Sequence, residues 1–158
     1  MGARIDYYDD PDAPAATTLV PSANVVVANS VGEVLLIRRT DNGNWALPGG
    51  AMDLSESLPA CGVRETREET GIDCEITGLV GIYTDPKHVI LYRSNGEVRQ
   101  EFSVVYTASY LGGEATVSTE SRDVRWIAPG ALGSLPMDRS MRLRLDHYLQ
   151  RRPTPYLG

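Results

Sequence analysis

The chain is poor in the residues that mark disulfide-rich, zinc-binding and membrane-spanning proteins. It has only two cysteines in 158 residues, Cys61 and Cys74, and neither lies in a Cys-x-x-Cys or histidine-rich cluster. A zinc site is therefore not supported, and reduced thiols are expected. No stretch approaches the roughly 20 apolar residues that cross a bilayer, and the N-terminus lacks the apolar run of a signal peptide. We expect a cytoplasmic protein with no membrane partner.

Basic residues are scarce relative to acidic ones. The chain has 15 Lys and Arg against 21 Asp and Glu, a formal charge of −6. Such a chain repels a phosphate backbone at long range, so we expect neither DNA binding nor nonspecific coating of RNA. The acidic surplus either serves solubility or gathers carboxylates around divalent cations, and the total count does not separate the two.

The length suits one domain and leaves little room for a second core. We expect residues 1–20, which are polar, to form an N-terminal arm or an irregular lead-in. Residues 21–152 would form the single domain, and residues 153–158 a loose tail. An arm ordered by a second copy of the chain would make a homodimer, which we hold as a hypothesis. We find no internal repeat and no low-complexity block.

The order of the predicted elements indicates the fold class. Short β-branched runs and alternation predict strands, and 3.6-residue periodicity predicts helices. We expect strands at 23–29, 33–39, 73–84, 87–92, 97–111 and 124–127, and helices at 57–70 and from Asp138 onward. The strand at 97–111 would place Phe102, Val104, Tyr106 and Ala108 on one face. Because strands and helices do not alternate regularly, an α+β fold with a mixed sheet is expected.

Three carboxylates stand close together on the helix predicted at 57–70. Glu65, Glu68 and Glu69 are spaced to project from one face. A helical wheel places them on the face that docks against the sheet, with Leu58, Cys61 and Ile72, and opposite Thr66, Arg67 and Thr70. Buried carboxylates repel one another, and a divalent cation would neutralise them. All-oxygen ligation selects Mg²⁺ or Mn²⁺ over zinc. The alternative is a solvated face paired with arginine.

The segment from Gly50 to Ile72 resembles the Nudix box, G-x(5)-E-x(7)-R-E-U-x-E-E-x-G-U, in which U is a bulky aliphatic residue. Eight residues match at the required spacings: Gly50, Glu56, Arg64, Glu65, Glu68, Glu69, Gly71 and Ile72. Thr66 departs, because it stands where an aliphatic residue is expected. The chain is thus similar to the Nudix hydrolase (MutT-like) family, loosely from about Val25 to Trp126.

The resemblance implies an α/β/α sandwich and hydrolysis of the pyrophosphate bond in a nucleoside diphosphate linked to another group, with Mg²⁺ or Mn²⁺ as cofactor. It implies metal ligation by Gly49, Glu65, Glu68 and Glu69 and a structural brace between Glu56 and Arg64. Glu68 would be either a further ligand or a residue that helps to orient the attacking water. A further acid outside the box is expected as ligand or general base. Glu120 is favoured for this role over Glu101, and Glu68 is the third choice for the base.

Substrate contacts and substrate identity are predicted on weaker cues. Arg38 or Arg39 would contact a phosphate, and the alternative for these arginines is a solvated strand end. Trp45 or Tyr83 would stack on a base, and the alternative for these aromatic residues is core packing. Pro86 stands where the family's ADP-ribose hydrolases have a proline, which favours ADP-ribose or a nucleotide sugar. A nucleoside triphosphate hydrolase is the alternative. A non-catalytic nucleotide-binding regulatory module is the alternative of another class, and it should lack one of the acids.

Overall fold

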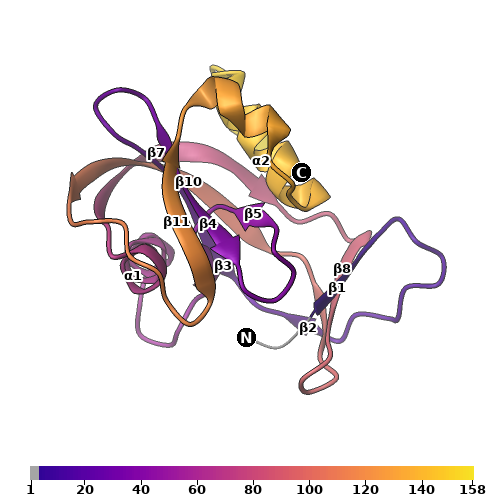
Figure 1. Cartoon of the computed structure of the whole chain (residues 1–158). Coiled ribbons are helices and arrows are strands. Elements are labelled where there is room, and N and C mark those ends of the chain that lie inside the picture. Colours follow the sequence, from indigo (N-terminus) through magenta and orange to yellow (C-terminus); the bar gives the residue numbers. More distant parts are fainter. Residues whose placement is uncertain (1–3) are drawn as a thin grey trace.

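Two β-sheets of different size and two α-helices organise residues 4–158, the part of the chain that this computed structural model describes (Figure 1). In chain order the elements are β1 (Arg4–Tyr8), β2 (Thr18–Leu19), β3 (Ser22–Ala28), β4 (Val34–Arg39), β5 (Trp45–Ala46), β6 (Gly49–Ala51), α1 (Leu58–Thr70), β7 (Asp73–Tyr83), β8 (His88–Tyr92), β9 (Val98–Gln100), β10 (Ser103–Gly112), β11 (Ser121–Ile127), a 3₁₀ helix (Pro129–Ser134), α2 (Arg139–Leu149) and β12 (Tyr156–Leu157). No helix within residues 4–158 is long and apolar enough to span a membrane.

The large sheet is mixed and lies between the helices. Its strand order is β11-β4-β3-β10-β7-β12, with β5 beside β4 and β6 beside β3. Strands β3 and β10 run parallel, whereas β10 and β7 run antiparallel. Helices α1 and α2 lie on opposite sides of this sheet (Figure 1). The α+β fold and the α/β/α sandwich are therefore confirmed.

The core explains why the central strands are continuous apolar runs. Val25–Val27 on β3 and Val34–Leu36 on β4 are completely buried. A strand that is covered on both faces needs apolar residues at every position rather than at alternate ones. Both cysteines are also buried and form no disulfide, as expected from the sequence.

Helix α1 begins and ends where the sequence predicts. The Ser57 hydroxyl accepts a hydrogen bond from the N–H of Ala60 at 3.2 Å, and Pro59 lies in the first turn, where its missing N–H is harmless. Gly71 ends the helix in the left-handed conformation, with φ at 75°. These signals are local, so sequence alone suffices to place the helix.

The buried face of α1 differs from the helical-wheel expectation. Glu69 is buried as expected and the Glu65 side chain is 15% exposed, but the Glu68 side chain is 58% exposed. Thr66 and Thr70, expected on the outer side, are completely buried. Each threonine hydroxyl donates to the backbone carbonyl four residues earlier, so burial leaves no hydroxyl unsatisfied. Thr66 can therefore occupy the position where an aliphatic residue was expected.

Both ends of the described chain are more ordered than the sequence predicts. Within the expected arm, β1 pairs with β8 and β2 pairs with β9, forming a small sheet in the order β1-β8-β9-β2. The tail is not loose, because β12 pairs with β7. Unpaired sheet edges are covered in this way by short segments from elsewhere in the chain. Residues 1–3 of the arm lie outside the described residues, and the domain boundaries remain predictions.

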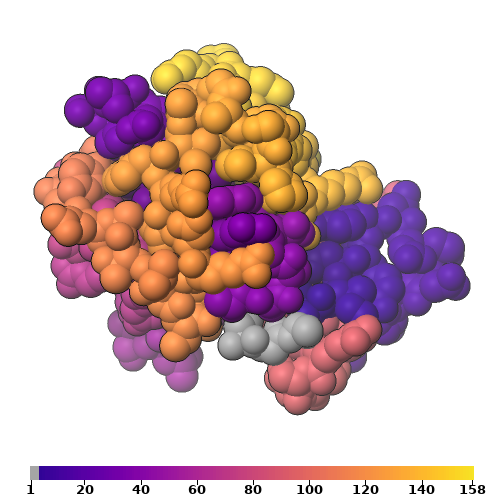
Figure 2. Space-filling view, in the orientation of Figure 1, coloured from indigo at the N-terminus to yellow at the C-terminus, as the bar shows by residue number. Residues whose placement is uncertain are grey.

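The strand predicted at 97–111 is broken in two. Val98–Gln100 forms β9 in the small sheet, whereas Ser103–Gly112 forms β10 in the large sheet. The break falls at Glu101 and Phe102, where the chain passes between the sheets. The N-terminal part of the small sheet forms a lobe beside the main body (Figure 2). This lobe and the large sheet together frame the pocket described below.

Close contact between α1 and β3 generates a stability prediction. A Cβ atom on Gly62 would lie 2.8 Å from Cγ2 of Val25, a stiff side chain in the core. We expect Gly62→Leu to reduce the free energy of unfolding by about 1–3 kcal/mol, the usual effect of overpacking. Ala60→Leu, on the exposed side of the same helix, is the matched control. Urea denaturation that found both variants equally stable would contradict this packing.

Candidate active site

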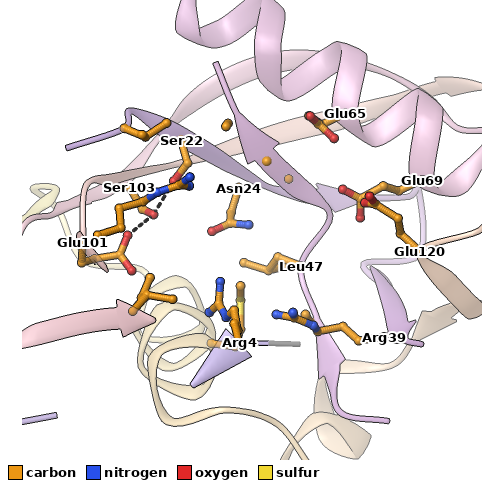
Figure 3. A pocket seen from close by; sticks show the side chains of 18 of the residues that line it. Arg4, Ser22, Asn24, Arg39, Leu47, Glu65, Glu69, Glu101, Ser103 and Glu120 are labelled. Atoms are coloured by element: carbon orange, nitrogen blue, oxygen red, sulfur yellow. Dashed lines mark hydrogen bonds between the residues drawn. The ribbon is translucent and has the colours of Figure 1, made fainter. Parts of the chain in front are cut away.

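A pocket of about 260 Å³ lies between α1, the large sheet and the small sheet. Its polar lining includes charged side chains of both signs (Figure 3). Glu65 and Glu69 from α1 lie along one wall with Glu120, which immediately precedes β11. Arg4 from β1 and Arg39 from β4 reach in from another side. Acids and bases that are distant in sequence are thus gathered around one space.

Burial and repulsion perturb the two helix carboxyl groups. Glu69 is only 4% exposed. Burial, followed by the charges of Glu65 and Glu120, raises the pKa of Glu69 to about 9. Burial also raises the pKa of Glu65, which accepts a hydrogen bond from the Glu69 side chain. In the absence of a bound cation, a shared proton therefore holds the pair together near neutral pH.

The loop that precedes α1 approaches these carboxylates through glycine. A Cβ on Gly50 would lie 2.5 Å from Oε1 of Glu65, so a side chain there would displace the carboxylate. The N–H of Gly49 donates to the Glu69 carboxyl group, which opposes the rise in its pKa. The absence of a side chain at Gly50 therefore lets β6 lie directly against Glu65, whereas Gly49 is required by the close approach of β6 to Ala23 on β3.

Arg64 joins the loop before α1 to the helix. Its Nη2 and Nε donate to the two carboxylate oxygens of Glu56 at 2.7 and 2.9 Å. Glu56 also accepts the backbone N–H of Asp53, and its pKa falls to about 2, chiefly through the Arg64 hydrogen bonds. Arg64 Nη1 further contacts Glu65 and Glu68 at 3.1 and 3.2 Å. The geometry fits the brace expected for Glu56 and Arg64.

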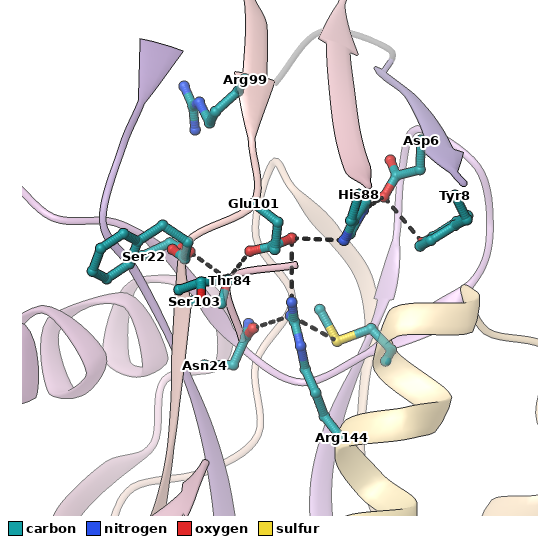
Figure 4. Close-up of polar contacts among 12 residues, drawn as sticks. Asp6, Tyr8, Ser22, Asn24, Thr84, His88, Arg99, Glu101, Ser103 and Arg144 are labelled. Carbon is teal, nitrogen blue, oxygen red and sulfur yellow. Dashed lines mark hydrogen bonds and ion pairs between the residues drawn. The ribbon is translucent and has the colours of Figure 1, made fainter. Parts of the chain in front are cut away.

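The remaining acids fall into different environments. Glu68 does not line the pocket and lies at the exposed end of the Arg64 contacts. Glu101 lines the pocket, but its carboxylate lies 3.1 Å from His88 Nδ1 and 3.3 Å from Arg144 Nη2 and also accepts from Ser103. Glu101 is therefore engaged in a buried polar network (Figure 4). Glu120 lies beside the Glu65–Glu69 pair, which makes it the better-placed fourth acid.

Of the four residues expected to contact substrate, Arg39 lines the pocket and the other three lie elsewhere. Arg38 Nε donates to the carbonyl of Gly43 at 3.0 Å. Trp45 is 6% exposed and packs in the core, as its alternative role predicts. The Tyr83 hydroxyl lies 2.8 Å from His147 Nδ1 and faces a second cavity behind Arg144.

Several residues that line the pocket were not predicted from the sequence. Arg4, Asn24, Arg99 and Arg144 all line the pocket, although none belongs to a motif. Asn24 alone could have been singled out from the sequence, because it is a polar residue inside a β-branched run. The other three come from separate elements that only the tertiary fold brings together.

The acidic wall fits a hard divalent cation in its chemistry. Within residues 4–158, no group of three Asp, Glu, His or Cys side chains is placed so that it could hold a metal ion. Glu65 and Glu69 nevertheless form an all-oxygen pair, and Glu120 lies beside them. Such donors suit Mg²⁺ or Mn²⁺, which keep several water and substrate ligands.

Comparison with known proteins establishes the family. A NUDIX domain family model matches residues 18–149, more than half of the chain. The chain belongs to the Nudix family. A putative 8-oxo-dGTP diphosphatase of Bacillus subtilis is 34% identical over 111 residues, which span 70% of this chain and 67% of that protein. The resemblance of residues 50–72 to the Nudix box is thereby confirmed, and so is the assignment to Nudix hydrolases.

Other relatives extend the comparison. An ADP-ribose pyrophosphatase of Methanocaldococcus jannaschii is 30% identical over 109 residues, which cover 67% of this Nudix chain and 60% of the archaeal protein. The crystal structure of the MutT protein from Methanosarcina mazei Go1 matches with a TM-score of 0.67 at 24% identity, covering 86% of this chain and 96% of that one. This structural likeness shows the shared fold.

The raised pKa of Glu69 predicts a pH-dependent stability in the presence of a chelator. Its pKa is about 9 in the folded protein against an ordinary value of 4.5. The folded state therefore holds the proton more tightly, and this stabilisation is lost as the pH rises toward and through the folded pKa. We expect the free energy of unfolding to fall between about pH 5 and about pH 9, and Glu69→Gln to remove most of that slope.

Urea denaturation at a series of pH values measures this slope. Glu68→Gln removes one charge from the exposed side of the same helix and controls for the change in net charge. A Glu69→Gln profile as steep as that of the wild type would show that Glu69 is not the titrating group.

Proposed function

We propose that this Nudix protein hydrolyses the pyrophosphate bond of a nucleoside diphosphate linked to another group, with Mg²⁺ or Mn²⁺ held at Glu65 and Glu69. The observation that carries the proposal is the pair formed by the buried Glu69 carboxyl group and the largely buried Glu65 carboxyl group, at the wall of a pocket that arginines also line. Two repelling acids in one buried place are costly unless a cation neutralises them. The same place would receive the phosphates of a substrate.

The residues of the pocket suggest a division of labour. When bound, the cation would offset the charge of the phosphates and lower the pKa of the attacking water. Glu65 and Glu69 would be its carboxylate ligands, and the Gly49 N–H would orient Glu69. Glu120 would accept a proton from the water, because it lies on the pocket side of its loop. Arg39 would contact a phosphate oxygen.

Two further assignments concern residues at the edge of the site. We propose that Glu56 and Arg64 act structurally, holding the loop before α1 against the helix. The ligand and water-orienting role expected for Glu68 remains a prediction. Glu68 would have to exchange its contact with Arg64 for one inside the pocket.

Two substrate classes remain candidates. The relatives include proteins named for 8-oxo-dGTP and for ADP-ribose. Pro86, the sequence cue for ADP-ribose, lies in an exposed turn between β7 and β8 and does not line the pocket. The preference for ADP-ribose or a nucleotide sugar therefore remains a prediction without structural support, and a nucleoside triphosphate is the second candidate.

The predicted homodimer and cytoplasmic location also remain predictions. The dimer hypothesis relied on an arm ordered by a partner, but β1 and β2 pair with strands of the same chain. The described part of the arm therefore finds its partners without a second subunit.

Removal of one ligand tests the proposed metal site. We expect Glu69→Gln to lower kcat by at least about 100-fold with Mg²⁺, because transition-state charge would no longer be offset fully. Steady-state kinetics would measure the loss, and circular dichroism would verify the fold. Glu75→Gln, an exposed acid on β7, is the control. Near wild-type turnover by the Glu69→Gln variant would refute the assignment.

Product analysis tests the reaction itself. We expect at least one nucleotide in a panel with Mg²⁺ or Mn²⁺ to give a nucleoside monophosphate. A sugar phosphate as the second product would indicate an ADP-ribose-like substrate, and pyrophosphate would indicate a triphosphate. If no nucleotide is turned over, the non-catalytic binding module becomes the better account.

A further inference from the structure

Asn24 on β3 places an amide group in the pocket, and its neighbour Arg144 fixes the orientation of that amide. Arg144 Nη1 donates to Oδ1 of Asn24 at 2.5 Å. Because a guanidinium group has no acceptor, the atom that faces it must be the amide oxygen. The amide nitrogen, Nδ2, therefore occupies the other branch of the side chain. Figure 3 shows the oxygen of Asn24 on the side of Glu101 and the nitrogen on the side of Glu69.

One N–H of this amide has no acceptor among residues 4–158. Nδ2 carries two hydrogens, and its one acceptor in this part of the chain is the carbonyl of Pro48, at 3.5 Å, the outer limit of a hydrogen bond. Asn24 is only 8% exposed. A buried donor without a partner is unfavourable, and folded proteins retain few of them. The free N–H therefore indicates an acceptor that a bound molecule supplies.

The amide nitrogen lies beside the backbone that contacts the acids. Asn24 is directly opposite Gly49 where β3 pairs with β6, and a Cβ on Gly49 would collide with Nδ2 of Asn24. The N–H of Gly49 in turn donates to the carboxyl group of Glu69. A pyrophosphate group bound at Glu65 and Glu69, as proposed above, would bring its oxygens to this part of the pocket.

Arg144 is itself held by a buried polar network. Its Nη2 lies 3.3 Å from Oε2 of Glu101, and the same oxygen lies 3.1 Å from Nδ1 of His88 (Figure 4). The side chains of Arg144, Glu101 and His88 are all buried. A donor whose neighbours are fixed in this way is preorganised, so that little ordering of Asn24 is needed when a substrate binds.

We propose that Asn24 is a substrate-binding residue, whose free amide N–H donates to a phosphate oxygen of the substrate beside Gly49. A neutral donor of this kind stabilises negative charge on the oxygen without adding a charge to the pocket. Both candidate substrate classes contain a pyrophosphate group, so Asn24 would serve either of them. The inference rests on the proposed hydrolysis at Glu65 and Glu69, and it adds a residue from outside the box at residues 50–72.

Two substitutions at one position separate the donor from the rest of the side chain. Asn24→Asp removes the amide donor and keeps an oxygen that Arg144 can bind, whereas Asn24→Ala removes both groups and adds no charge. With Mg²⁺ present, we expect each variant to lower kcat/KM by about 10- to 100-fold, the usual effect of losing a hydrogen bond to a charged group. The loss should be similar on dGTP and on ADP-ribose if the wild type hydrolyses both. Asn42→Asp, in the exposed turn between β4 and β5, is the matched control for charge.

The outcomes separate a substrate contact from a structural one. Wild-type kcat/KM in either Asn24 variant, or a loss on only one of two hydrolysed substrates, would overturn the proposal while leaving hydrolysis intact. If the wild type hydrolyses neither nucleotide, calorimetric binding of inorganic pyrophosphate in Mg²⁺ decides. Weaker binding by both Asn24 variants than by Asn42→Asp would then support the contact, and equal binding would overturn it. Thermal unfolding verifies that each variant is folded, and Asn24→Leu, which has the same branching, replaces Asn24→Ala if the latter is not.

Discussion

The close approach of the carboxyl groups of Glu65 and Glu69 is the constraint on which the arrangement of the pocket depends. The two groups share a proton-dependent contact beside Glu120, and they stay close because their helix is fixed at several points. Capping by Ser57 and Gly71 sets the ends of α1, and the absence of a side chain at Gly62 lets it approach β3. The fold thus holds the two carboxyl groups so close that Glu69 keeps a proton near neutral pH when no cation is bound, and a divalent cation would take the place of that proton.

The small sheet supplies another part of the lining of the pocket that contains these acids. A buried chain of polar contacts runs from Asp6 on β1 through His88 and Glu101 to Arg144 on α2 (Figure 4). Arg144 in turn donates to Asn24 on β3, inside the pocket. Charged groups that would be costly to bury alone find partners within this network, although the Nε of Arg144 makes no hydrogen bond within residues 4–158. This network therefore connects β1 to residues that line the pocket and helps to hold the strand in position.

Local signals account for what the sequence predicted well. The limits of α1 follow from residues close in the chain, whereas the contact between Glu56 and Arg64 was expected from the resemblance to the Nudix box. The buried face of α1 was harder to predict, because the hydroxyls of Thr66 and Thr70 are buried and donate to backbone carbonyls of their own helix. The pairing of β1 and β12 with distant edge strands leaves no local periodicity to detect. The contribution of Arg4 to the pocket was missed for that reason.

Proton release on metal binding tests the central claim most directly. If the Glu69 carboxyl group is protonated near neutral pH and becomes a ligand, each bound cation must displace that proton. Calorimetric titration of the wild type with Mn²⁺, in buffers of different ionisation enthalpy, counts the protons released. The account predicts release of about one proton per cation near neutral pH. Binding without proton release, or no binding, would contradict a metal site formed by this carboxyl pair.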